Sequence, residues 1–213
     1  MPDDFPSGFF ARGDETDDAA FYAFPRFVTH IDDPAIAAVG ALYERLGIRG
    51  DVLDLMSSWV SHFRAAPANL TVLGMNAEEL AANPQARAGV VHDLNAEPVL
   101  PFADRVFDHA VCCVSVDYLT APVDVFRDIG RVVRPGGLFV CTFSNRLFPT
   151  KAVRGWLMSD DMTHTRIVSA YFGAAGGFGT PSVEVCTPPG RGSDPLYAVW
   201  AAVADRTPGA EPR

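Results

Sequence analysis

The sequence predicts a doubly wound α/β fold, with a mostly parallel sheet of seven strands and a small helical lid. Short, almost continuously apolar segments, typical of buried parallel strands, alternate with segments of helical periodicity. The last two apolar segments flank the turn-rich stretch TPPGRGSD, which predicts a closing antiparallel pair. The chain has 213 residues, of which 48% are hydrophobic and 20% charged, so we expect one globular domain around one core.

The expected strands and helices follow one another in a regular order. The strand segments are DVLDLM, LTVLGMN, GVVHDL, HAVCCVSV, GGLFVCTFSN, SVEVC and PLYAVWAAVA. Between them, helical periodicity predicts a short helix through Val60 and Phe63, a second at AEELAANP and a third at PVDVFRDIGRVV. RLFPTKAVRGWLMSD and DMTHTRIVSAYF predict one or two further helices before GAAGGFG interrupts the pattern.

A further helix is expected before the first strand. Asp33 can cap it, Pro34 suits its first turn, and Gly47 follows its last turn. Its apolar positions recur at helical spacing at Ile36, Val39, Tyr43 and Leu46. We therefore expect this helix to pack against another part of the domain.

The charge distribution favours a small-molecule ligand. The formal net charge is -9, and the first 18 residues hold six acidic residues against one arginine. Because phosphate binding needs a basic surface, we expect neither a nucleic acid nor an anionic membrane as partner. No apolar stretch approaches the roughly 20 residues that cross a bilayer. The N-terminus has no basic start followed by an apolar run, so we expect a cytoplasmic protein.

The cysteines give no sign of a metal or redox site. Cys112, Cys113, Cys141 and Cys186 form no CxxC pair and no ligand-like grouping with the five histidines. Neighbouring Cys112 and Cys113 would point to opposite faces of a strand, so they could not share one metal ion. We expect buried, reduced thiols and no bound metal, with a metal or redox role as the alternative.

Two stretches carry a family resemblance. HDLNAEPVLPFADRVFDHAV is similar to the pattern D-x-x-x-LPF-x-D-x-x-FD-x-V, and RVVRPGGLFVCTFSN resembles R-V-L-K-P-G-G with the strand after it. Both patterns are typical of class I S-adenosylmethionine-dependent methyltransferases, especially the small-molecule "type 11" branch. The resemblance implies a Rossmann-like fold and S-adenosylmethionine as cofactor. We expect three parts: residues 1–47 as acidic N-terminal segment and lid helix, 48–205 as the cofactor-binding domain that the resemblance implies, and 206–213 as flexible tail.

The resemblance also implies cofactor-binding residues at the carboxyl ends of the strands, where doubly wound sheets bind ligands. Asp54 would hold the amino-acid part of the cofactor, with helix capping as the alternative. Met56, Ser57 and Ser58 stand where the family has a glycine-rich loop, so they must follow the same path or displace it.

The next three strand ends complete the expected cofactor site. Asn76 occupies the position of an acid that accepts the ribose hydroxyls, so either the amide binds them, with help from Glu78, or it caps a helix. Asp93 and Leu94 resemble the adenine-binding pair, with a turn aspartate as the alternative. Val114 and Ser115 would lie beside the sulfonium or form a buried strand.

The acceptor side is less specific. Asp117 and Tyr118 follow the fourth strand and are the candidate catalytic residues. For each candidate residue on this side, the alternative is a structural role. The candidate substrate-binding residues come from the fifth strand end and from the expected lid, and are Arg26, His30, Asn145, His164 and Tyr171.

We expect methyl transfer by direct displacement to a small molecule, with a small thiol as first choice and a phenol, amine or carboxylate as alternatives. A thiol needs little help from a base, because part of it is thiolate at neutral pH. The second hypothesis is a binding module with little or no turnover, since both the glycine loop and the ribose-binding acid are replaced. A third, an NAD-dependent oxidoreductase, lacks its GxGxxG fingerprint after DVLDLM.

Overall fold

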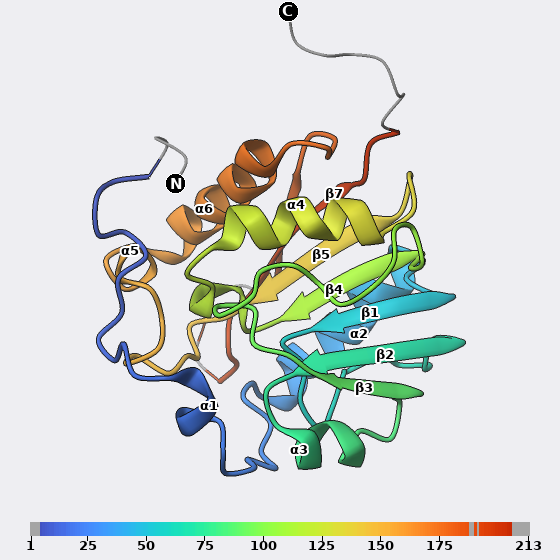
Figure 1. Cartoon of the computed structure of the whole chain (residues 1–213), viewed down its shortest axis with the longest axis horizontal. Coiled ribbons are helices and arrows are strands. Elements are labelled where there is room, and N and C mark those ends of the chain that lie inside the picture. Colours follow the sequence, from blue (N-terminus) through green and yellow to red (C-terminus); the bar gives the residue numbers. More distant parts are fainter. Residues whose placement is uncertain (1–4, 188–189, 191, 206–213) are drawn as a thin grey trace, which may run out of the picture.

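The computed structural model describes residues 5–187, 190 and 192–205, and contains one seven-stranded sheet with helices on both faces (Figure 1). The strand order is β3-β2-β1-β4-β5-β7-β6. Strands β1 to β5 run parallel, and β7 is antiparallel to both β5 and β6. The strands are β1 (Asp51–Leu55), β2 (Asn69–Gly74), β3 (Ala88–Val91), β4 (His109–Cys113), β5 (Leu138–Phe143), β6 (Ser182–Thr187) and β7 (Leu196–Ala202). The predicted α/β class, the seven strands and the closing antiparallel pair are confirmed.

Two groups of helices cover the two faces of the sheet. The helices are α1 (Asp18–Phe21), α2 (Asp33–Arg45), α3 (Ala77–Ala82), η1 (Val116–Tyr118), α4 (Pro122–Val132), α5 (Arg154–Leu157) and α6 (Asp161–Ala175). Helices α4 and α6 share a core with one face, in which Phe126 meets Phe139 and Phe172 edge-on at 4.8 Å each. Helices α2 and α3 cover the opposite face, where the second core lies. In the described part of the chain, no helix is both long and apolar enough to span a membrane.

Helix α2 packs on one face of the sheet. It does not form the lid helix that we expected within residues 1–47. Val39 and Leu42 are completely buried, because they pack on the sheet within the second core. The helix is capped by Asp32, whose carboxylate accepts from the amide of Ala35 at 3.0 Å, one residue earlier than predicted. The expected tail at 206–213 lies outside the described residues.

The predicted helix through Val60 and Phe63 is wrong. Residues 56–68 connect β1 to β2 without a helix. Met56 and His62 have φ angles of 50° and 57°, which no α-helix allows. The backbone amides of this connection bond outward: Ser57 N–H donates to the Leu73 carbonyl at 2.8 Å and Phe63 N–H to the side chain of Gln85 at 3.2 Å. The connection therefore lies against the ends of the strands.

The N-terminal segment, residues 5–31, crosses the side of the sheet on which the parallel strands end (Figure 1). A buried ion cluster holds it there. The ammonium of Lys151, which is 0% exposed, lies 3.0 Å from a carboxylate oxygen of Asp18 and 3.2 Å from one of Asp14. Asp18 also binds Arg12 at 2.7 Å and accepts from the amide of Asn95 at 2.9 Å. This segment is thus a fixed wall of the molecule.

Candidate functional site

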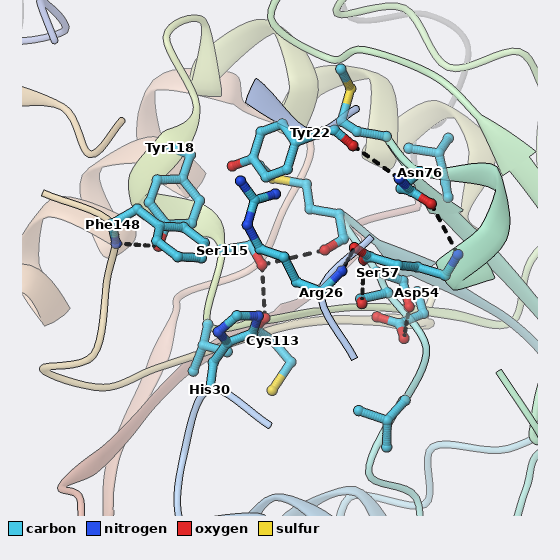
Figure 2. A pocket seen from close by; sticks show the side chains of 18 of the residues that line it. Tyr22, Arg26, His30, Asp54, Ser57, Asn76, Cys113, Ser115, Tyr118 and Phe148 are labelled. Carbon is cyan, nitrogen blue, oxygen red and sulfur yellow. Dashed lines mark hydrogen bonds between the residues drawn. The ribbon is translucent and has the colours of Figure 1, made fainter. Parts of the chain in front are cut away.

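One cavity of about 430 Å³ lies at the carboxyl ends of the parallel strands, a size within the usual range of roughly 300–1,000 Å³ for small-molecule sites (Figure 2). One of its walls consists of strand ends and the turns that follow them. The other consists of the N-terminal segment and residues 145–148, after β5. We call these two sides the strand-end wall and the N-terminal wall.

Asp54 sits near the end of β1 and lines the cavity. Its side chain is buried, and one carboxylate oxygen accepts a hydrogen bond from the Ser57 hydroxyl at 2.7 Å. Burial penalises the charged form and raises the pKa of Asp54 to about 7. The carboxyl therefore titrates near neutral pH, and a cationic ligand in the cavity would stabilise its ionised form.

The loop after β1 follows its path without the usual glycines. Met56 adopts a left-handed φ of 50°, which costs an ordinary residue about 1–3 kcal/mol. The close approach is made possible from the opposite side, by Gly74 at the end of β2. A Cβ at that position would collide with the carbonyl oxygen of Ser57. The close contact between this loop and β2 therefore needs a glycine in the strand, Gly74, and not in the loop.

Val114, directly after β4, also has a left-handed backbone, with φ of 47°. This is a strained conformation for a β-branched residue. The hydroxyl of the next residue, Ser115, donates to the carbonyl of Cys113 at 2.9 Å and lies 3.3 Å from the carbonyl of Met56. Val114 and Ser115 both line the cavity, beside the loop that follows β1.

Asn76 lines the cavity, but its polar atoms have partners within the protein. Its side-chain oxygen caps α3, accepting from the amides of Glu78 and Glu79 at 3.0 and 3.1 Å. Its amide nitrogen donates to the carbonyl of Tyr22 at 3.0 Å (Figure 2) and to that of Ala23 at 3.3 Å. Asn76 is therefore a helix cap that also ties the N-terminal wall to the sheet.

Glu79 is a cavity residue that the sequence analysis missed. It is buried and accepts from the backbone amide of Arg26 at 2.6 Å and from the hydroxyl of Ser58 at 2.5 Å. Glu78, the acid that was expected to assist, is exposed and lies outside the cavity lining. The signal was present, because Asn76 and Glu79 have the N-cap-to-N3 spacing of a capping box.

Asp93 and Leu94 lie where the turn after β3 meets the cavity. One carboxylate oxygen of Asp93 accepts from the amides of Asn95 and Ala96 at 2.9 and 3.2 Å, which shapes the turn. Both bonds use the same oxygen. Leu94 is buried in the core below it, so this turn presents one carboxylate and one apolar surface.

Of the candidate substrate-binding residues, Arg26, His30 and Asn145 line the cavity. His164 and Tyr171 lie outside its lining, because both are on the inner face of α6. The His164 ring stacks on Trp156 at 3.9 Å, and Tyr171 is fully buried beside Phe126. Their expected contact with substrate is therefore replaced by a packing role.

The two candidate catalytic residues have different environments. Asp117 is buried behind the cavity lining, and its Oδ2 has no hydrogen-bond partner among the described residues. Burial raises its pKa to about 8, so at neutral pH the carboxyl is mostly protonated, which disfavours a role as base. Tyr118 does line the cavity, and its hydroxyl accepts from the amide of Phe148 at 2.9 Å. Burial raises the pKa of Tyr118, so it remains a neutral hydrogen-bonding group.

Three imidazoles line the same cavity, His30, His62 and His92, and the last two were missed. Burial lowers the pKa of His30 and of His62, to about 4 for His62, so these two rings are neutral at pH 7. The His30 ring meets Phe148 edge-on at 5.3 Å. A neutral imidazole can accept a proton, which gives the site a base that the sequence had not revealed. In the described ranges, no three His, Cys, Asp or Glu side chains are grouped to hold a metal ion.

Comparison with known proteins shows which family the central part of the sequence resembles. Residues 53–141 match the methyltransferase domain family. No protein of curated function matches the chain. The match and the fold support methyltransferase activity and S-adenosylmethionine as cofactor, and the predicted resemblance to class I methyltransferases is confirmed.

Solved structures share the fold at low sequence identity. An S-adenosylmethionine-dependent methyltransferase from Aquifex aeolicus is 14% identical, with a TM-score of 0.55 over 82% of this chain and 92% of that one. The [4+2]-cyclase SpnF is 15% identical, with a TM-score of 0.57 over 88% and 91%. DhpI in its complex with SAH is 20% identical, with a TM-score of 0.53 over 80% and 85%.

Proposed function

We propose that this chain, which carries a methyltransferase domain within a class I methyltransferase fold, transfers the methyl group of S-adenosylmethionine to a small molecule. The single observation that carries the proposal is the cavity itself. It joins the strand ends that hold the cofactor in this fold to a wall of polar and aromatic side chains from the N-terminal segment. The second wall gives a methyl acceptor a place beside the cofactor.

The residues of the strand-end wall fit the cofactor. Asp54 is a carboxyl whose pKa is raised by burial, and a cationic cofactor would supply a positive charge that favours its ionised form. Asp93 and Leu94 offer a carboxylate and an apolar surface for the adenine. Val114 and Ser115 lie on the adjoining part of the wall, as expected for neighbours of the reacting methyl group.

Glu79 takes the ribose-binding role in this proposal, in place of Asn76. Both polar ends of Asn76 are already bonded within the protein, whereas Glu79 brings a carboxylate into the same cavity from one turn later in α3. Its oxygens accept one hydrogen bond each, and a carboxylate oxygen can accept two. Ribose hydroxyls would add to those bonds or replace the one from Ser58.

When bound, S-adenosylmethionine supplies an electrophilic methyl group, which a nucleophile displaces with S-adenosylhomocysteine (SAH) as the leaving product. The protein's part is to hold the acceptor in line and to exclude water. His30, neutral at pH 7, is placed to take a proton from the acceptor, and Tyr118 is placed to position it. As nucleophile we place a small thiol first, because it needs least help from a base, with phenols, amines and carboxylates as alternatives.

Calorimetry with S-adenosylmethionine and SAH, followed by mass spectrometry of products from a panel of thiols, phenols, amines and carboxylates, tests this function. We expect one binding site per chain and at least one methylated product. If neither compound binds to the folded protein, the proposal is wrong.

A second candidate is a module that binds the cofactor without methyl transfer. It is favoured by the loop without glycines and by the engagement of Asn76 in capping. One protein with this fold is a [4+2]-cyclase, so the fold alone does not determine the reaction. Tight cofactor binding without product in single-turnover reactions would favour the module.

A further inference from the structure

Arg26 brings a guanidinium group into the cavity from the N-terminal wall. Its Nη2 donates to the carbonyl of Phe21 at 2.8 Å, and its Nη1 lies 3.4 Å from the carbonyl of Phe24. In the part of the chain that the structure describes, no carboxylate pairs with this guanidinium. These contacts use two of its five N–H donors and neutralise none of its charge.

The acids around the cavity have other partners. Asp18 is paired with Arg12 and Lys151, and Asp54 accepts from Ser57. Asp93 accepts from two turn amides. Glu79 does form a hydrogen bond with Arg26, but it accepts this bond from the backbone amide of Arg26 and not from the guanidinium group. The positive charge of Arg26 is therefore available to a ligand.

Aromatic rings hold the guanidinium by its faces. Its central carbon lies 4.6 Å from the ring centre of Phe21, 5.7 Å from that of Tyr22 and 5.6 Å from that of Phe148. Figure 2 shows the guanidinium between Tyr22 and the pair formed by Tyr118 and Phe148. Cation–π contact to the faces leaves the N–H edge of the planar group for hydrogen bonds. A flat, forked acceptor such as a carboxylate matches that edge.

Phe148 and two further rings form an apolar surface next to this positive charge. Phe148 lies between the Tyr118 ring, stacked at 6.0 Å, and the His30 ring, edge-on at 5.3 Å. All three side chains line the cavity. A ligand that binds the edge of Arg26 would therefore have its body against aromatic rings, and a flat conjugated ring makes the largest contact with them.

We propose that the methyl acceptor is a small aromatic carboxylic acid, with its carboxylate on Arg26 and its ring against Phe148 and Tyr118. This inference rests on the proposed function and specifies its substrate. A carboxylate is favoured over a phosphate because acids outnumber cations around the cavity: Asp18, Asp54, Glu79 and Asp93 against Arg26 and Arg146. Since Arg146 is also near Asp194, at 3.5 Å, a dianion would find too little positive charge.

Matched acid and amide probes test the proposal. We would measure binding of 4-hydroxybenzoate and 4-hydroxybenzamide by calorimetry, with and without SAH, and methylation of 2-mercaptobenzoate and 2-mercaptobenzamide by mass spectrometry. The wild type should prefer each acid by about tenfold or more, since a hydrogen bond to a charged group is worth roughly 1.5–3 kcal/mol. R26Q should remove that preference, and R26K should keep part of it. R127Q, at an exposed position of α4, is the control and should keep it fully.

The outcomes separate this inference from the proposed function. If SAH fails to bind the wild type while R26Q still abolishes benzoate binding, the function is wrong and the carboxylate site stands. If acids and amides bind equally, or none of the probes binds, the inference is wrong.

One competing role for Arg26 needs its own measurement. If R26Q weakens SAH but leaves 5′-methylthioadenosine, which lacks the amino-acid part, unchanged, Arg26 binds the cofactor carboxylate, and the inference is overturned. A melting temperature close to that of the wild type would show that R26Q is folded.

Discussion

The two walls of the cavity differ in how much of their polar chemistry is already used. On the strand-end wall, the side chain of Ser57 bonds within its own turn, and both polar ends of Asn76 already have partners within the protein. On the N-terminal wall, no carboxylate of the described residues pairs with the guanidinium of Arg26. The ring nitrogens of His30 also have no hydrogen-bond partner among these residues. The first wall is thus fixed in shape before any ligand binds, while the second holds the groups that can select an acceptor.

The walls also differ in how they are attached. Ladder hydrogen bonds between parallel strands hold the strand-end wall. The N-terminal wall is attached by scattered contacts: a few backbone hydrogen bonds, such as that from the amide of Asp14 to the carbonyl of Thr150 at 2.8 Å, and the contacts of Lys151 with Asp14 and Asp18. It follows that the acceptor side can be lost by substitutions that leave the sheet intact.

The largest effect is expected for Lys151→Met. Removing one partner from a buried ion cluster costs about 3–5 kcal/mol. Residues 5–31 should lose protection from hydrogen exchange before the strands do, and methylation should fall with them. The exposed pair of Arg127 and Asp124 supplies the control, Arg127→Met, which should cost less than about 1 kcal/mol. Unchanged protection of residues 5–31 in the Lys151 variant would mean that other contacts anchor this wall.

Asn76→Asp should destabilise the protein by about 1–3 kcal/mol, although it installs the acid usual in the family. The carboxylate cannot donate to the carbonyls of Tyr22 and Ala23 and would repel them. Thermal unfolding measures the loss, and Glu78→Gln at the exposed neighbour is the control. An Asn76→Asp protein that is as stable as the wild type and binds SAH more tightly would show that we have assigned the ribose contact wrongly.

Asp93→Asn should weaken S-adenosylmethionine and SAH by about tenfold. The amide oxygen can still accept from Asn95 and Ala96, so the turn is kept while the charge is lost. Glu79→Gln should have a smaller effect in the same direction. Calorimetry measures both affinities. If folded Asp93→Asn binds the two compounds as tightly as the wild type does, Asp93 does not bind the adenine.

A further effect concerns pH. The folded pKa values of Asp54 and Asp117, about 7 and about 8, lie above the ordinary value of 3.8, so both carboxyls hold their protons more tightly in the folded state. Their contribution to stability is therefore lost as pH rises from about 4 through 8. Asp117→Asn should gain melting temperature relative to the wild type between pH 6 and pH 9, by about 2–4 °C for each 1 kcal/mol. A difference that stays constant with pH would rule out this titration.

Some elements of the fold could be predicted because local patterns decided them. The stripe of Val125, Phe126, Ile129 and Val132 predicted α4, and all four residues are buried. The connection after β1 could not be predicted in this way. Its apolar residues suggested a helix, but the left-handed Met56 and the room left by Gly74 are properties of two segments in contact.

The same division holds for the site. The sequence by itself determined the order of the strands along the chain and the residues that end them, because apolar segments and turns are local and the carboxyl ends of parallel strands share one edge. Only the tertiary structure decided that Asn76 caps a helix, that Glu79 and His62 face the cavity, and that α6 buries His164 and Tyr171. The reason is physical: the direction of a side chain and its desolvation depend on neighbours far away in the sequence, such as Lys151 on Asp18.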